Sequence, residues 1–413
     1  MREFAASFHP RRSRYMVATW ALTSVGQTIG FILVVAMALA GCGQGVGTAA
    51  SASKTPGPDY GATATPYGQR AVPTLALTPP PGWSPVLSGL QFTNTSTHGA
   101  LVASAARPGR VIGCGMSTPI YQPTPPIFVL SNDGGQTWQT RTIPNLPSAQ
   151  GCDVLADTLQ PDTFAVEPEI YRGSLYVTRD AGVTWKALEL PLLTRPIGLA
   201  GGQLFAVANR AYGQPGTLLQ ASLTTGSWRT IATNLPEAGS DPYAAVMDPD
   251  NPAVIYLSGF SRSTSANGTG CAVYRTTDGG ASWQLAHLLP SARHIALYTA
   301  HQQQVIAEQV DAIENPQQLS YSADGGTTWQ DSSIGAGDLL WVSPQGRTYT
   351  ESWVATAPMT DTLYALDPAH GTSKPIGTYT LGPGPGLLAV VDGPAPALLY
   401  ATPDQIWRLP LST

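Results

Sequence analysis

Short apolar runs alternate with clusters of turn-forming residues along most of the chain. Ile127 to Leu130 and Leu175 to Val177 are two such runs, and each leads into a Gly-containing turn. Runs of this length between turns are typical of β-strands. The chain also has 43 Gly and 37 Pro among its 413 residues, and both residue types destabilise helix interiors. The pattern therefore predicts an all-β protein made of many short strands.

Four segments repeat one motif: Ser or Thr, any residue, Asp, any residue, Gly, any residue, Thr or Ser, and Trp. They are 131–138, 178–185, 276–283 and 322–329, and a shortened copy without the Asp spans 222–228. An apolar run enters each copy and another strand leaves from its Trp, so each copy is predicted to be the turn of a β-hairpin.

Each conserved position of the motif has a physical role in such a turn. The Asp carboxylate accepts hydrogen bonds from turn N–H groups, the second Gly can adopt positive φ, and the Trp is a large apolar plate between neighbouring sheets. The residues given these structural roles are Ser131, Asp133, Gly135, Trp138, Thr178, Asp180, Gly182, Trp185, Thr276, Asp278, Gly280, Trp283, Ser322, Asp324, Gly326 and Trp329.

The motif resembles the Asp-box, or bacterial neuraminidase repeat, of sialidases, sortilin-type receptors and photosystem II assembly factors. The resemblance implies a β-propeller of four-stranded blades. It implies little about activity, because the boxes of those families lie on hairpins far from their active sites. We therefore interpret the box residues as structural.

The spacing of the boxes gives the number of blades. Neighbouring boxes are about 47 residues apart, with the shortened copy filling the one double interval. Residues 89–413 hold about seven such units, within the range that propellers use. We predict seven blades, with six as the alternative. The last blade has only three strands of its own, so a strand near Leu87–Phe92 is predicted to supply its fourth and close the ring.

The N-terminal region predicts export and membrane attachment. Basic residues at 11–14 precede a nearly uncharged apolar stretch that ends in Leu39-Ala40-Gly41-Cys42, as in a secretory signal. This ending resembles the bacterial lipobox, which implies a lipid on Cys42. The alternative is an uncleaved membrane anchor, since the stretch is long enough to span a bilayer. Either interpretation places the protein at the cell membrane, facing outward.

Composition divides the chain into three parts. Residues 1–41 are the signal peptide or anchor, 42–82 form a low-complexity Gly/Ala/Ser/Thr/Pro-rich linker, and 83–413 form the propeller. The formal net charge is −5 although the first part is basic, so the propeller is acidic, and the whole chain has only three lysines. Such a balance argues against a nucleic-acid partner.

Cysteine and histidine are sparse. An exported chain permits a disulfide, and Cys114 and Cys152 are the candidate pair, with buried thiols as the alternative. The histidines lack zinc-site spacing, and no motif for a phosphate-bearing cofactor is present, so we expect neither metal nor cofactor.

Ligand binding is predicted on the ring face opposite the boxes. The inner-strand loops there are expected at 117–126, 167–174, 209–217, 259–270, 308–318 and 352–361. Tyr, Trp and Arg dominate binding hot spots, and several loops also carry acidic residues. The candidate ligand-face residues are Tyr121, Glu167, Tyr171, Arg172, Arg210, Tyr212, Arg262, Glu308 and Trp353.

Two functions compete. We favour a binding or assembly module for a protein or glycan ligand; the alternative is an exo-sialidase-like glycoside hydrolase. The Arg-Ile-Pro motif of sialidases is absent, and Arg195-Pro196 is the nearest approach. Arg347, Tyr349 and Glu351 imitate part of a sialidase site, and alternation predicts that all three share one strand face. Arg107 and Arg110 flank a turn-like Pro-Gly, a poor setting for a carboxylate clamp.

Overall fold

The computed structural model describes residues 82–92, 100–117, 123–149, 151–168, 173–192, 194–208, 216–233, 235–236, 245–260, 271–289, 294–310, 316–332, 339–354, 360–380, 387–401 and 405–411. These residues form 28 strands in seven antiparallel four-stranded sheets, and no helix lies among them. The predicted signal segment, Cys42 and all but the last residue of the predicted linker lie outside the described residues.

Each sheet is one blade. In six blades the strands follow one another in chain order from the ring centre outward, and in the last blade the first strand of the described chain takes the outermost position. Blade 1 has β2 (Leu101–Ala103), β3 (Val111–Gly115), β4 (Ile127–Ser131) and β5 (Gln139–Thr142). Blade 2 has β6 (Cys152–Ala156), β7 (Phe164–Pro168), β8 (Ser174–Thr178) and β9 (Lys186–Glu189). Blade 3 has β10 (Thr194–Ala200), β11 (Gln203–Ala208), β12 (Thr217–Ser222) and β13 (Trp228–Ala232).

The remaining blades repeat this order. Blade 4 has β14 (Ala245–Met247), β15 (Ile255–Phe260), β16 (Cys271–Thr276) and β17 (Gln284–Leu289). Blade 5 has β18 (His294–Ala300), β19 (Gln304–Val310), β20 (Pro316–Ser322) and β21 (Gln330–Ser332). Blade 6 has β22 (Leu339–Val342), β23 (Thr348–Val354), β24 (Thr360–Asp367) and β25 (Thr372–Thr380). Blade 7 has β26 (Leu387–Val391), β27 (Ala397–Ala401), β28 (Gln405–Pro410) and β1 (Ser84–Ser88).

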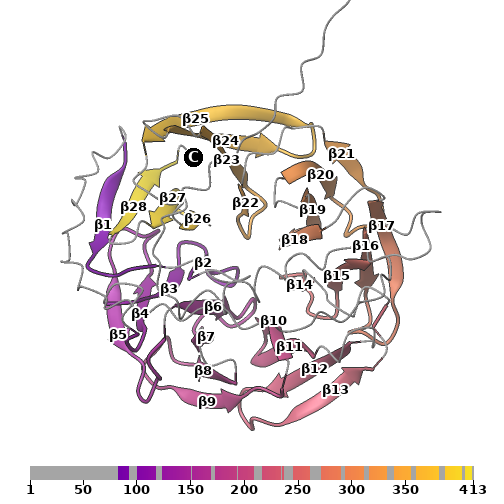
Figure 1. Cartoon of the computed structure of the whole chain (residues 1–413), viewed down its shortest axis with the longest axis horizontal. Coiled ribbons are helices and arrows are strands. Elements are labelled where there is room, and N and C mark those ends of the chain that lie inside the picture. Colours follow the sequence, from indigo (N-terminus) through magenta and orange to yellow (C-terminus); the bar gives the residue numbers. More distant parts are fainter. Residues whose placement is uncertain are drawn as a thin grey trace, which may run out of the picture. The chain divides into compact units, whose positions relative to one another are not determined.

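The seven blades close into a ring (Figure 1). The innermost strands β2, β6, β10, β14, β18, β22 and β26 contact one another in that order, and β26 contacts β2. The predicted fourth strand of the last blade is β1, which pairs with β28 a few residues earlier in the chain than expected. The seven-bladed prediction is thus confirmed. This closure joins the beginning of the described chain to its end.

Apolar side chains fill the spaces between neighbouring blades. Along β7, Phe164 and Val166 pack towards blade 1, whereas Ala165 packs towards blade 3. This alternation buries both faces of each sheet, which explains the near-continuous apolar runs of the inner strands. The core is therefore a series of seven inter-blade layers.

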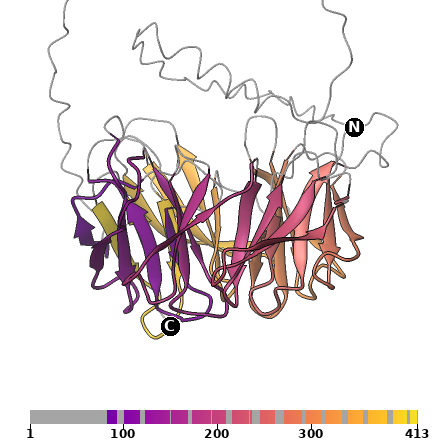
Figure 2. The same cartoon turned by 90° about the horizontal axis from the view of Figure 1, so that it is seen from below.

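Antiparallel order places the connections on two opposite ends of the strands (Figure 2). We call one end the box face: it holds the turns between first and second strands and the turns between third and fourth strands. The opposite end, the loop face, holds the connections between second and third strands and between blades.

Candidate functional site

The four boxes form the same hydrogen-bonded turn. In the first, the Ser131 hydroxyl donates to Asp133 Oδ1 at 2.8 Å, and the Gly135 N–H donates to Ser131 Oγ at 2.9 Å. Asp133 also accepts from the N–H and the hydroxyl of Thr137. The boxes at Asp180, Asp278 and Asp324 repeat these contacts. The carboxylates are therefore occupied by their own turns, as a structural role requires.

The same donors stabilise the ionised carboxylates. Hydrogen bonds from the N–H and hydroxyl of Thr328 lower the pKa of Asp324 to about 2. Burial by itself would raise the pKa of Asp180, but hydrogen bonds from Thr184 and Thr178 lower it. A carboxyl group held ionised in this way is a poor general acid at neutral pH.

The second Gly and the Trp of a box act on the neighbouring blade. Gly182 has a φ of +85°, and a Cβ there would lie 2.8 Å from the Phe128 ring of blade 1. Trp185 packs edge-on against Phe128, with ring centroids 5.1 Å apart. Both the positive φ and the lack of space require glycine at position 182, and Trp185 packs in the layer between the two sheets.

Each box also holds the inner turn of its own blade. The residue after the box Asp donates its N–H to a carbonyl of the turn between the first and second strands. These bonds are Gly134 to Gly109, Ala181 to Asp162, Gly279 to Ala253 and Gly325 to Gln303, and in the shortened copy Leu223 bonds to Gly202. The box therefore fastens the outer hairpin to the inner one.

Cationic side chains fasten several boxes to the preceding blade. Arg408 donates to the Gly134 carbonyl at 2.7 Å, and Arg141 donates to the Ala181 carbonyl at 3.0 Å. Lys186 donates to the carbonyl of Thr224 in the shortened copy at 3.2 Å. These Arg and Lys side chains thus link the boxes to the neighbouring blades by hydrogen bonds.

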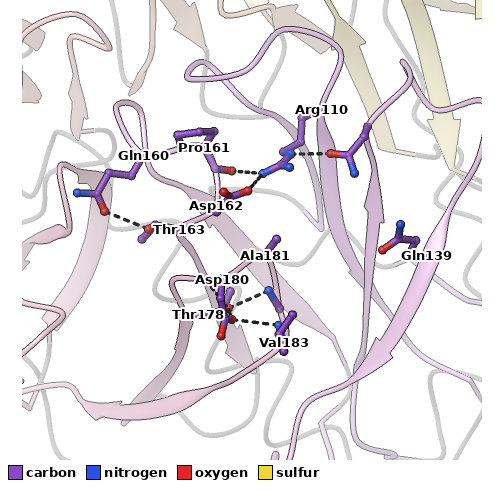
Figure 3. A network of polar contacts seen from close by, with 12 residues as sticks. Arg110, Gln139, Gln160, Pro161, Asp162, Thr163, Thr178, Asp180, Ala181 and Val183 are labelled. Atoms are coloured by element: carbon purple, nitrogen blue, oxygen red, sulfur yellow. Dashed lines mark hydrogen bonds and ion pairs between the residues drawn. The ribbon is translucent and has the colours of Figure 1, made fainter.

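Arg110 is buried between blades 1 and 2 (Figure 3). It donates to Asn132 Oδ1 at 2.8 Å and to the Pro161 carbonyl, and it forms an ion pair with Asp162. Its guanidinium also lies 5.7 Å from the centre of the Phe164 ring. The Arg110 guanidinium is therefore occupied by contacts that join blades 1 and 2.

His301, in the turn between β18 and β19, joins four blades at the box face. Its Nδ1 lies 2.5 Å from Asp250 Oδ1 of blade 4, and its Nε2 lies 3.3 Å from the Ala105 carbonyl of blade 1. Its backbone N–H donates to the Pro344 carbonyl of blade 6 at 2.8 Å. Blades 1 and 5 are not neighbours, so the turn of blade 1 reaches across this end of the ring. No sequence motif marked His301, because its partners come from distant turns.

The Cys114 and Cys152 sulfurs are bonded in a disulfide. Cys114 lies near the end of β3 and Cys152 begins β6, so the bond joins blades 1 and 2 near the loop face. Cys271 is buried in blade 4.

Three candidate ligand-face residues lie in described strands. Glu167 is in β7 opposite Asp153, and the backbone of Trp353 is in β23 opposite Asp361. Glu308 lies within β19 and is only 4% exposed, so the loop expected at 308–318 begins too early. The strand continues because the Tyr298 hydroxyl satisfies the buried carboxyl, donating to Glu308 Oε2 at 2.9 Å. The others, Tyr121, Tyr171, Arg172, Arg210, Tyr212 and Arg262, lie outside the described residues.

The residues that imitate a sialidase site belong to blade 6. Tyr349 is 7% exposed and packs in the core between blades 6 and 7. Glu351 is two residues further along β23. Arg347 pairs with Asp392 at the box face, with Nε 3.5 Å from Oδ1. Arg195 and Pro196 lie in β10 of blade 3. The Tyr349 hydroxyl is thus held in an inter-blade layer, where burial raises its pKa.

Ser320, His287 and Asp331 meet between blades 4 and 5, but not as a catalytic triad. The Ser320 hydroxyl donates to Asp331 Oδ1 at 2.7 Å, and His287 Nε2 lies 3.1 Å from Ser320 Oγ. Asp331 approaches the same His nitrogen, at 3.5 Å. A triad needs the carboxylate on the other ring nitrogen, and Ser320 is 1% exposed. These contacts therefore fasten two blades.

Among the described residues, no group of three or more His, Cys, Asp or Glu side chains is placed to hold a metal ion. None of those residues forms a helix with the length and apolarity needed to cross a membrane.

Comparisons with known proteins find similar solved structures but no similar sequence family. No protein-family model and no curated protein matches the sequence. A chain in a mitotic checkpoint complex matches with a TM-score of 0.52 and 8% identity, over 89% of this chain and all 100% of that one. YCF48 from Cyanidioschyzon merolae matches with a TM-score of 0.49 and 12% identity, over 79% of this chain and 98% of that one. A Niastella koreensis GH74 enzyme matches with a TM-score of 0.40 and 11% identity, over 76% of this chain and 60% of that one. The seven four-stranded sheets and their closed ring of contacts make the protein a seven-bladed β-propeller.

Proposed function

We propose that this protein is an exported, lipid-anchored Asp-box propeller that binds a protein or glycan ligand through its loop face. Three observations support the proposal. Polar side chains of the box face are engaged in bonds that hold the ring together, the loop-face connections vary and contain Tyr and Arg, and a disulfide is present. The first carries the most weight.

Structural bonds engage the chemistry-bearing side chains of the box face. Box carboxylates accept from their own turns, Arg110 joins blades 1 and 2, and His301 joins four blades. Asp157 is fully buried and accepts four backbone N–H groups, two of them from Gly201 and Gly202 of blade 3. A ligand at this face would have to compete with the bonds that hold the ring together.

The loop-face connections differ from blade to blade, as expected of a recognition surface. The stretch between Phe260 and Cys271 is long, whereas that between Ala401 and Gln405 is short. Connections between second and third strands contain Tyr and Arg residues of the kind that dominate binding hot spots. They include Tyr121, Tyr171, Arg172, Arg210, Tyr212 and Arg262.

The disulfide supports export, because disulfides persist in oxidising compartments outside the cytoplasm. The basic and apolar N-terminus with Cys42 supplies the route. Mass spectrometry of the mature N-terminus tests this part: we expect acylated Cys42, and release of the Cys42→Ser variant from membranes. An intact N-terminus starting at Met1 in the membrane fraction would favour the uncleaved anchor.

Binding is tested by pull-down of surface-fraction proteins with the purified propeller and by a glycan array in parallel. The variants are Tyr212→Ala and Arg172→Ala on the loop face, with the box-face change Val183→Ser as matched control, because Val183 is 67% exposed. We expect at least one loop variant to lose about tenfold or more in affinity, and the control to bind normally. Loss of binding by the control alone, with the fold intact, would refute the assignment to the loop face.

The glycosidase alternative has its own assay. With Tyr349 in the core and Arg347 on Asp392, we expect no hydrolysis of a fluorogenic sialoside. Turnover abolished by Tyr349→Phe or Glu351→Gln would instead establish the enzyme.

A further inference from the structure

A buried carboxyl group lies in the layer between blades 5 and 6. Glu308 is 4% exposed and lies opposite Leu319 in the sheet. The apolar layer around it contains Ile306 and Leu319 of blade 5 and Leu340 and Leu366 of blade 6. An ionised carboxylate is costly in such surroundings unless it is paired.

The described residues give Glu308 a hydroxyl partner but no cation. Tyr298 donates to Glu308 Oε2 at 2.9 Å, and none of the ion pairs among those residues includes Glu308. The apolar cluster of this layer includes the phenols of Tyr321 of β20 and Tyr364 of β24. Among the described residues, the one charged group that acts on Tyr321 is the carboxyl of Asp367, at the end of β24, and it is negative. The strand β22 contributes only apolar Leu340 and Val342 to it. No positive charge within this described layer therefore offsets ionisation of Glu308.

We propose that the joint between blades 5 and 6 is pH-responsive, and that loss of the Glu308 proton loosens the packing of these two blades. The neutral carboxyl fits the layer, whereas the carboxylate favours conformations that admit water. Blade 6, like blade 7, has no copy of the box motif, so it lacks the turn that links blades 1 to 5 to their neighbours. The proposal does not depend on the identity of any ligand.

The sign of the pH effect follows from linkage. Burial raises the pKa of Glu308 to about 7, although the Tyr298 hydrogen bond acts in the opposite direction. In the unfolded chain the group titrates near its ordinary value, so between about pH 4.5 and 7 the folded state holds the extra proton. The contribution of protonated Glu308 to the unfolding free energy is then complete below about pH 4.5 and falls as the pH rises to about 7. The unfolding constant should increase by about two orders of magnitude over that range.

The test measures the Tm of the wild type and of Glu308→Gln from pH 5 to pH 8. Glu189→Gln is the matched control, because Glu189 is an exposed glutamate in β9. We expect the Tm of the wild type and the control to fall as pH rises, and the Glu308→Gln curve to be flatter and higher at pH 8. Hydrogen exchange, corrected for the intrinsic pH dependence, should show the wild-type loss of protection in β19 and β22. Parallel Tm curves for wild type and Glu308→Gln would overturn the proposal.

A second variant keeps the proposal testable should Glu308→Gln not fold. Tyr298→Phe removes the one hydrogen bond that favours the carboxylate, so the pH midpoint of the Tm decline should move upward. An unchanged midpoint in Tyr298→Phe, with the fold intact, would contradict the role of this pair.

Discussion

The joint between blades 1 and 2 and the joint between blades 5 and 6 connect similar sheets by different means. The first has a disulfide near the loop face, Arg110 at the box face, and Trp185 packed on Phe128 between them. The second depends on apolar packing around the Tyr298–Glu308 pair, with a backbone bond from His301 to Pro344.

This difference shows what the repeated box turn contributes to this propeller. Every blade buries an apolar layer. In each blade with a box or its shortened copy, the outer turn is also hydrogen-bonded to the inner turn and, in several cases, to the preceding blade. Among the described residues, blade 6 shows no such bond between its outer and inner turns. Directional polar bonds fix one arrangement more strictly than apolar packing does. The ring therefore combines rigid joints with one whose stability depends on protonation.

The largest expected effect is loss of the disulfide. The bond closes a loop with a sequence separation of 38 residues, so the double variant Cys114→Ser, Cys152→Ser should lose about 4 kcal/mol of unfolding free energy by the chain-entropy argument. Urea unfolding of both proteins measures it. Reducing agent should leave the hydrogen exchange of β19 and β22 unchanged in the native wild type, and faster exchange there would mean that the two joints are coupled.

Removal of the aromatic plate between blades 1 and 2 should cost slightly less. Trp185→Ala deletes a partly buried ring that packs against Phe128, and we expect a loss of about 3 kcal/mol. The conservative substitution Trp185→Phe keeps an aromatic ring at this position and should therefore cost only about half as much unfolding free energy. Equal stability of the Ala and Phe variants would show that ring packing does not hold this joint.

The two regions should also respond to pH in opposite directions. Hydrogen bonds lower the pKa of Asp180, so its contribution is complete above about pH 4 and is lost as pH falls. The stabilising contribution of Glu308 is instead lost as the pH rises towards about 7. Asp180→Asn should therefore flatten the acid side of the Tm curve and leave the decline between pH 5 and 8 unchanged. A changed decline at neutral pH would contradict this separation.

The sequence predicted the architecture because the boxes are local. Ser131, Asp133 and Thr137 lie within seven residues, so their contacts form inside one turn and appear as a motif. The closing strand was also predictable, since the last blade has three strands of its own, although β1 lies a few residues earlier than expected.

The long-range joints could not be predicted in the same way. His301 and Ala105 are 196 positions apart, and Tyr298 and Glu308 meet only because β18 and β19 pair in one register. The alternation of apolar and polar residues along a strand predicts which face a side chain occupies, but not which residue it contacts. From the sequence, Glu308 is assigned to a loop because acidic side chains are rarely buried without a pair. The ligand face remains a prediction from residue types.

The most direct test of the central claim, that the boxes stabilise the ring while the loop face recognises the ligand, is a paired measurement on Asp278→Ala. The Tm and the binding of the captured surface partner are measured on one preparation, well below the Tm. We predict a lower Tm, because the donors Ser282 and Thr276 lose their carboxylate, and unchanged affinity. An unchanged Tm with binding abolished would contradict the account.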